Sequence, residues 1–343
     1  MLKKLLRGVE ARAPWLAVGR PLLLRAGFDI KQGYEKTIIG ALGEKNDPAR
    51  ELRLRSSLVE HLVAGEKYVR VFKIKSSERA ALESWMQSKR AKSNALTDAF
   101  PGIAGNQILK NALGTLNSVG YEVFQNGMAA IYTGARAYLE RVDVPKSQLK
   151  SGASEYEKLF GIRQTLVQTY EAIWLPKSMG VACVCTDFPL TAPKGFSTIS
   201  QEALKGELQK QLHRIPNPLN LWKAIDGIYN APGGRAVDYG FTNNEDSVKH
   251  HKGRSGTKCL RDDIYDKAGA AAAGDDLSFF KLAMRWKRKR KDLDDEVTDP
   301  ELLLPGQASF LHAANATLDH AIVRNCYDTD DLNFVLDKIL AHV

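Results

Sequence analysis

Five consecutive cationic residues at 287–291, Lys-Arg-Lys-Arg-Lys, constrain the fold of this chain more than any other feature. A charged side chain is costly to bury without a partner, because the loss of hydration is not repaid. The run must therefore face solvent, bind an external polyanion or meet carboxylates from elsewhere in the chain. Phosphates are the commonest polyanion for such a run, and the preceding Trp286 can stack on a base. The run predicts a nucleic-acid contact.

The other charges are spread unevenly over the 343 residues, whose formal net charge is +9. Residues 1–26 carry a net charge of +5, residues 248–291 one of +8, and residues 292–343 one of −9. One interpretation is an anion-binding face built from the two basic segments. The other is that the acidic C-terminal segment packs against the basic run and neutralises it.

Hydrophobic periodicity predicts a mixed α/β (α+β) architecture that is helix-rich, with a few dispersed strands. One expected helix starts near Ser154, where Glu157 completes a capping box, and continues through Trp174. The other helices are expected at 50–64, 77–89, 106–116, 201–214, 219–229, 259–273, 277–291, 308–326 and 332–342. Strands are expected at 68–75, 181–186 and 235–242.

A β-hairpin is expected near 121–133, where Asn126-Gly127 separates two apolar runs. Asn-Gly supplies the two positive-φ positions of a type I′ turn. Pro145 and the polar residues after it suggest a domain boundary. Residues 1–147 would form an N-terminal α+β domain with a basic first helix. Residues 148–343 would form a helix-rich C-terminal domain that holds the basic 248–291 stretch and the acidic tail.

A second candidate site is the sequence His-His-Lys-Gly-Arg-Ser-Gly-Thr-Lys at 250–258, which has the composition of a phosphate-binding loop. It is not a Walker A motif, because Thr257 separates Gly256 from Lys258. An imidazole can act as a general base or a nucleophile, so the candidate catalytic residues are His250, His251 and Asp238. The alternative is an exposed basic hairpin tip.

Magnesium is implied only if the protein is a nuclease, in which case Asp238 would bind it with Glu245 or Asp246. Otherwise no metal site and no cofactor is expected. The candidate phosphate contacts are the basic residues of the loop and of the run: Lys252, Arg254, Lys258, Arg285, Lys287, Arg288, Lys289, Arg290 and Lys291.

Three functions fit these residues. The first is a nucleic-acid-binding protein, for RNA or DNA, that contacts the phosphate backbone. The second is a metal-assisted phosphodiesterase that uses residues 238–262, and the third is a self-assembling subunit whose basic and acidic ends pair between copies. Whether the chain is an enzyme is left open.

The cellular setting is expected to be reducing and cytoplasmic, because four scattered cysteines cannot form a disulfide scaffold. Cys183 and Cys185 are expected on one face of a buried strand rather than on a zinc ion. No window approaches the roughly 20 apolar residues of a membrane helix, so no integral membrane association is expected.

Overall fold

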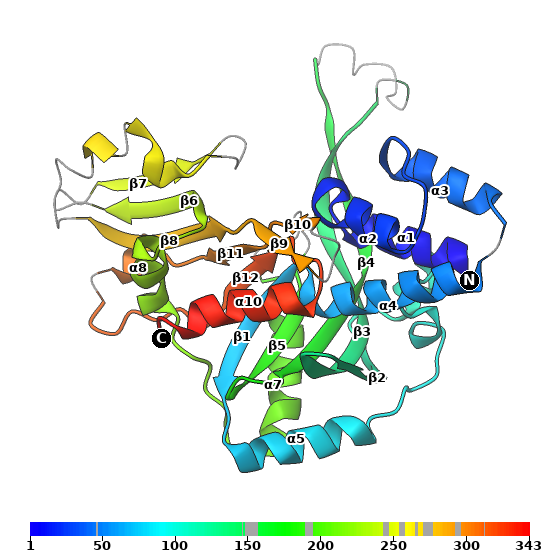
Figure 1. The fold of residues 1–343 in the computed structure, drawn as a ribbon, viewed down its shortest axis with the longest axis horizontal. Helices are drawn as coiled ribbons and strands as arrows, with labels where there is room; N and C mark the ends of the chain where they lie inside the picture. Colours follow the sequence, from blue (N-terminus) through cyan, green and yellow to red (C-terminus); the bar gives the residue numbers. More distant parts are fainter. Residues whose placement is uncertain are drawn as a thin grey trace.

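The computed structural model of the protein describes residues 1–45, 47–145, 147, 157–188, 195–242, 247–253, 258–264, 267–269, 277–291, 296–311 and 313–343. Its central element is a ten-stranded sheet in which every pairing is antiparallel (Figure 1). The strands follow the order β2-β3-β4-β5-β1-β12-β11-β8-β6-β7. Their bounds are β1 (Lys67–Lys73), β2 (Leu116–Phe124), β3 (Gly127–Asp143), β4 (Phe160–Pro176), β5 (Val181–Asp187), β6 (Arg235–Thr242), β7 (Val248–Lys252), β8 (Ser278–Arg285), β11 (Glu301–Leu304) and β12 (Ala321–Arg324).

The expectation of a helix-rich chain with a few dispersed strands is wrong. The segment expected as a helix from Ser154 to Trp174 contains all but the last two residues of β4, and every residue of β4 from Gln168 to Pro176 is buried. A strand covered on both faces shows no alternation of apolar and polar residues, so apolar spacing alone cannot separate it from a helix. The helices expected at 277–291 and 308–326 are also wrong, because these segments contain β8, a short strand β9 (Arg288–Arg290) and β12.

Other predicted elements are confirmed, including the strands β1, β5 and β6 and the long helix α4. Asp47 caps α4, since its carboxylate accepts hydrogen bonds from the backbone N–H groups of Ala49 and Arg50. The helices are α1 (Leu2–Arg12), α2 (Arg20–Arg25), α3 (Gly33–Gly43), α4 (Pro48–Ala64), α5 (Ser76–Ser88), α6 (Asn106–Asn111), α7 (Thr198–Leu212), α8 (Trp222–Asn230) and α10 (Thr329–Leu340).

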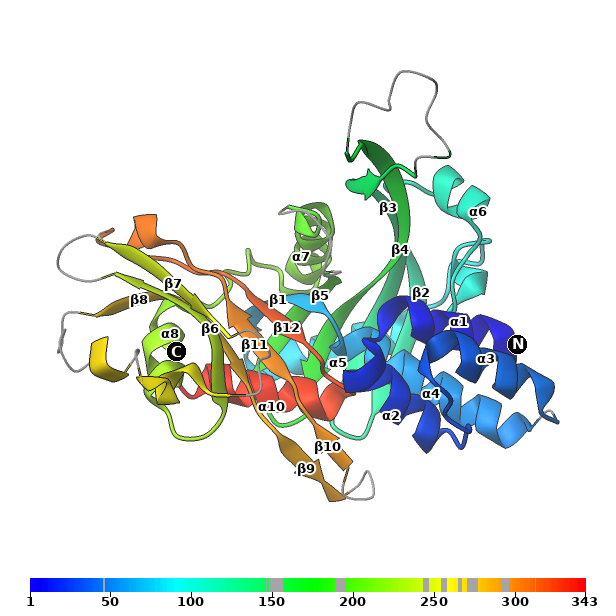
Figure 2. The ribbon, with the colours of Figure 1, turned by 90° about the horizontal axis from the view of Figure 1, so that it is seen from above.

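Different helices pack against the two faces of the sheet. Val69 and Val71 of β1 belong to the core beneath α4, α8 and α10, whereas Phe72 packs with α5 and α7 on the opposite face. α5 and α7 cover only the half of the sheet that contains β3, β4 and β5. In Figure 2, α8 and α10 lie on one side of the strands β12, β11, β8, β6 and β7, and no described α-helix lies on the other side.

The sheet continues across residue 147, the position suggested as a domain boundary, because β3 and β4 pair along 17 residues each. The free thiols of Cys183 and Cys185 are buried in one core cluster, as expected. Among the described residues, no helix is both long enough and apolar enough to cross a membrane.

The hairpin forms where it was expected, but its turn differs from the predicted one. Phe124 lies opposite Gly127, so the two loop residues are Gln125 and Asn126. Neither residue has a positive φ, so the type I′ turn at Asn126-Gly127 is wrong. A Cβ atom on Gly127 would lie 2.4 Å from Cη2 of Trp174, so glycine is required here by packing.

We expect Gly127→Ala to lower the free energy of unfolding by about 1–3 kcal/mol, because the indole of Trp174 and the backbone must move to admit a methyl group. Gly206→Ala is the matched control. A Cβ atom there meets nothing within 4 Å in α7, so helix propensity should stabilise the protein by up to about 1 kcal/mol. Equilibrium urea unfolding measures both changes, and equal stability of the two variants would contradict the close contact.

Candidate nucleic-acid interface

The basic run at 287–291 contains the strand β9, which pairs with β10 (Glu296–Thr298) in a separate two-stranded sheet. Side chains of a strand alternate between two sides. Lys287, Lys289 and Lys291 are exposed, whereas Arg290 is buried and Arg288 is partly buried. The run therefore presents three lysines outward and two arginines inward, instead of one cationic stripe on a helix.

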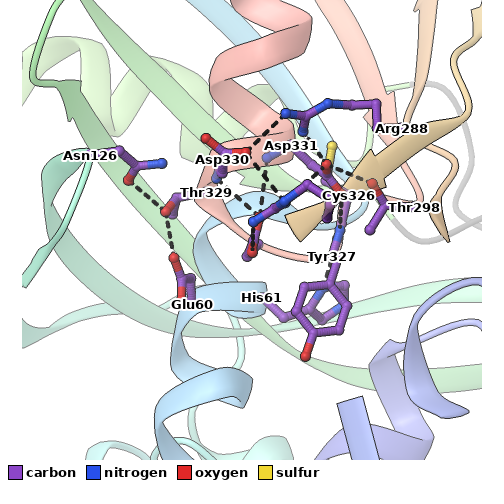
Figure 3. Close-up of polar contacts among 12 residues, drawn as sticks. Glu60, His61, Asn126, Arg288, Thr298, Cys326, Tyr327, Thr329, Asp330 and Asp331 are labelled. Carbon is purple, nitrogen blue, oxygen red and sulfur yellow. Dashed lines mark hydrogen bonds and ion pairs between the residues drawn. The ribbon is translucent and has the colours of Figure 1, made fainter. Parts of the chain in front are cut away.

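The two arginines contact the N-terminus of α10 (Figure 3). Arg290 donates two hydrogen bonds to the carboxylate of Asp328, at 2.9 and 2.8 Å, and Asp328 is also the N-cap of the helix. Arg288 pairs with Asp330 at 2.9 Å and with the fully buried Asp331. We call these five residues the Arg–Asp cluster.

Asp331 also accepts hydrogen bonds from two donors outside the Arg–Asp cluster. These are the hydroxyl of Thr298 at 2.9 Å and the backbone N–H of Tyr327 at 3.0 Å. Burial, and then the neighbouring Asp328 carboxylate, raises the pKa of Asp331. The acidic segment thus pairs with the basic run inside one chain. Arg288 and Arg290 already form ion pairs with carboxylates of their own chain. Because those carboxylates are already paired, this geometry argues against the hypothesis that the basic and acidic ends pair between copies.

The adjacent histidines lie on β7, an edge strand, and point to opposite faces of the sheet. His250 lies opposite Gly240, and its ring is 5.3 Å from that of Phe280. His251 contacts Tyr239 on the other face, with its Nδ1 3.4 Å from the phenol oxygen. The two imidazoles therefore do not meet on one face of the sheet.

Asp238 is held by Lys281, whose ammonium lies 2.9 and 2.8 Å from the two carboxylate oxygens. Among the described residues, no group of three or more His, Cys, Asp or Glu side chains is placed to bind a metal ion. Lys258 is exposed. Glu245, Asp246 and Arg254 lie outside the described residues.

The structure nevertheless brings four of the candidate residues to one surface. On the sheet face that no described α-helix covers, strand register places one row of side chains across six strands. That row consists of Tyr68, Ile322, Leu303, Ala283, Asp238 and Lys252. A second row, Arg324, Glu301, Arg285 and Arg235, runs beside it. With His250, these residues define what we call the open face.

Ion pairs organise the cations of the open face. Glu301 accepts hydrogen bonds from Arg285 at 2.5 Å and from Arg324 at 3.5 Å. At the α7 border, Arg70 pairs with Glu202 at 2.5 Å and with Asp319 at 2.8 Å. These ion pairs hold the guanidinium groups in position, and their side chains keep between 13% and 30% of their surface exposed.

An aromatic pair lies beside these arginines. The rings of Tyr68 and His320 are stacked, 4.2 Å apart and within 8° of parallel. A hydrogen bond from His320 lowers the pKa of Asp319, which keeps that carboxylate charged beside the imidazole. Burial, and then the Asp319 carboxylate, raises the pKa of Tyr68 to about 12, so its phenol stays neutral. The open face thus combines planar rings with fixed cations.

Sequence reasoning missed most of the open face. Arg235 and Arg324, and the Asp238 partner Lys281, were not candidates, because no run of cations marks them. The available signal was the alternation Lys281-x-Ala283-x-Arg285 within an apolar segment, which is typical of a strand with one polar face. Comparison of the chain with protein-family models, with curated proteins and with solved structures found no match.

Proposed function

We propose that the protein binds single-stranded nucleic acid across the open face, mainly through phosphates. The observation that carries the proposal is the register of six strands. It places Asp238, His250, Lys252 and Arg285 on one surface, with further cations and a stacked aromatic pair.

Physical chemistry supports this function in two ways. Arginine and lysine groups on a surface bind phosphates and release counterions, which makes the affinity depend on salt. Aromatic side chains on a sheet bind unpaired bases by stacking, a mode that suits single strands better than duplexes. Lys289 on β9, with Lys287 and Lys291 on either side of this strand, extends the same chemistry onto a second ribbon. A cytoplasmic location is part of the proposal.

Charge reversal on β7 tests the interface. Lys252 lies on the open face, whereas Lys249 is exposed on the same strand but faces the other side with His251. We expect Lys252→Glu to weaken binding of a labelled oligonucleotide about tenfold at 0.1 M salt, because a phosphate contact is lost and a repulsive charge is added. Lys249→Glu should change the affinity less than about twofold.

The measurement is fluorescence anisotropy with single-stranded and duplex RNA and DNA over a salt series. A triple variant, in which Lys287, Lys289 and Lys291 become glutamate, tests the outward lysines on and beside β9 separately. If only this triple variant weakens binding, the interface is on β9 and the open face is not the site. Absence of binding at low salt would refute the proposed function itself.

A further inference from the structure

A cavity of about 460 Å³ lies between the end of α1, the end of α4 and the strand β4. Its wall is partly apolar, with Leu62, Leu109 and Val167 among the lining residues. The same wall contains the side chains of Glu10, Arg12, Glu66 and Asp187. A cavity of this size with a few convergent polar groups is the common form of a small-molecule site.

Asp187 and Arg12 already form ion pairs within the chain. Asp187 binds Lys67 and Arg12, and it also accepts the backbone N–H of Tyr170 at 2.7 Å. Both terminal nitrogens of Arg12 are engaged, one with Asp187 at 2.6 Å and one with the carbonyl oxygen of Gln168. Its Nε has no hydrogen-bond partner in the part of the chain that the structure describes, but the guanidinium charge is balanced by Asp187.

The carboxyl group of Glu66 has incomplete hydrogen bonding among the described residues. Its Oε1 accepts the backbone N–H of Asn325 at 3.0 Å, whereas its buried Oε2 has no hydrogen-bond partner among the described residues. The backbone φ of Glu66 is +46°, in the left-handed region that side chains other than glycine rarely adopt. Strain of this kind persists where the surrounding structure enforces it, often at a ligand site.

We propose that this cavity binds a small organic cation, such as a protonated alkylamine, with the Glu66 carboxyl group as its anchor. Of the three lining carboxylates, Glu10 pairs with Arg7 and Asp187 pairs with Arg12 and Lys67, whereas Glu66 forms no ion pair among the described residues. An ammonium group supplies the donor that Oε2 lacks, and its alkyl chain fits the apolar part of the wall. An anion of the same size would meet the carboxylates instead.

Binding of the cation is coupled to the proton on Glu66. Burial raises the pKa of Glu66 to about 7. The charged groups that face it are Arg324 from β12, which opposes this shift, and Glu301 from β11 and Asp187 from β5, which reinforce it. A bound ammonium favours the carboxylate, so binding at pH 6 releases a proton, and affinity rises as the pH increases from 5 to 8.

The test uses n-butylammonium and n-butyrate, which share a chain and differ in charge, with isothermal titration calorimetry of the full chain. We expect saturable binding of n-butylammonium at pH 8, at least about tenfold tighter than binding of n-butyrate. At pH 6, titration in two buffers with different ionisation enthalpies should show proton release. Glu66→Gln should weaken n-butylammonium binding about tenfold at pH 8 and abolish the proton release.

Glu83→Gln on α5 is the matched control, because Glu83 forms an exposed ion pair with Arg79 outside the cavity wall. It should bind n-butylammonium as the wild type does. Equal affinity for the two probes, or a Glu66→Gln variant that is folded by circular dichroism and binds with unchanged affinity and proton release, would overturn the proposal.

Discussion

Arg290→Met is expected to lower the free energy of unfolding by about 3–5 kcal/mol, because it leaves buried carboxylates without their cation. The Arg290 side chain is 5% exposed and Asp328 is 6% exposed, so water cannot replace the lost hydrogen bonds. Arg288 would still neutralise Asp331, but Asp328 would keep only its helix-capping bonds. Equilibrium urea unfolding followed by circular dichroism measures the loss.

Two further variants separate this effect from a general loss of positive charge. Lys291→Met removes an exposed neighbouring cation and should change the stability by less than about 0.5 kcal/mol. Arg290→Met combined with Asp328→Asn should recover part of the loss, because asparagine keeps the N-cap without a charge. A single Arg290→Met variant as stable as Lys291→Met would show that the Arg–Asp cluster does not form.

Glu66→Gln is expected to stabilise the protein by about 3 kcal/mol at pH 8 and to have little effect below pH 4.5. The pKa of Glu66 is raised from 4.5 to about 7 in the folded protein, chiefly by burial. The folded state therefore holds a proton that the unfolded state releases above pH 4.5. Wild-type stability falls as the pH rises from 4.5 to 7, by about 1.4 kcal/mol per unit of pKa difference.

The pH profile of the stability difference between Glu66→Gln and the wild type is the measurement, from urea unfolding at pH 4.5 to 8. Titration of His61 does not affect this stability difference. Burial lowers the pKa of His61 to about 4, so its contribution is lost as the pH falls from 6.5 towards 4. That term is common to both proteins and cancels. A difference that stays constant with pH would show that Glu66 is ionised in the folded protein.

Sequence patterns within a single segment correctly predicted several helices and strands. The helices α4 and α5 and the strand β6 were identified because each has a clear periodicity and nearby start or stop residues. Failures occur where the partner of a segment is distant in sequence. β8 lies between β11 and β6, and β12 lies between β1 and β11, so neither strand could be identified without its neighbours.

The candidate site was predictable to a similar degree. The alternation of lysine and arginine within 287–291 is visible in the sequence, and on a strand it separates the residues into two sides. Only the fold shows that the arginines face Asp328 and Asp331, about 40 residues later in the chain. Likewise, Lys252 and Arg285 share a face because β6 and β8 pair, which no local pattern encodes.

The position of β12 has a consequence for synthesis of the chain on the ribosome. β12 is the last strand in sequence, yet it joins β1, the first, to β11 near the middle of the sheet. Until residues 321–324 emerge, β1 and β11 cannot pair with β12, which lies between them in the complete sheet. Exposed strand edges promote aggregation, and contacts this far apart in sequence form slowly. Nascent chains of this protein should therefore depend on chaperones until β12 closes the gap.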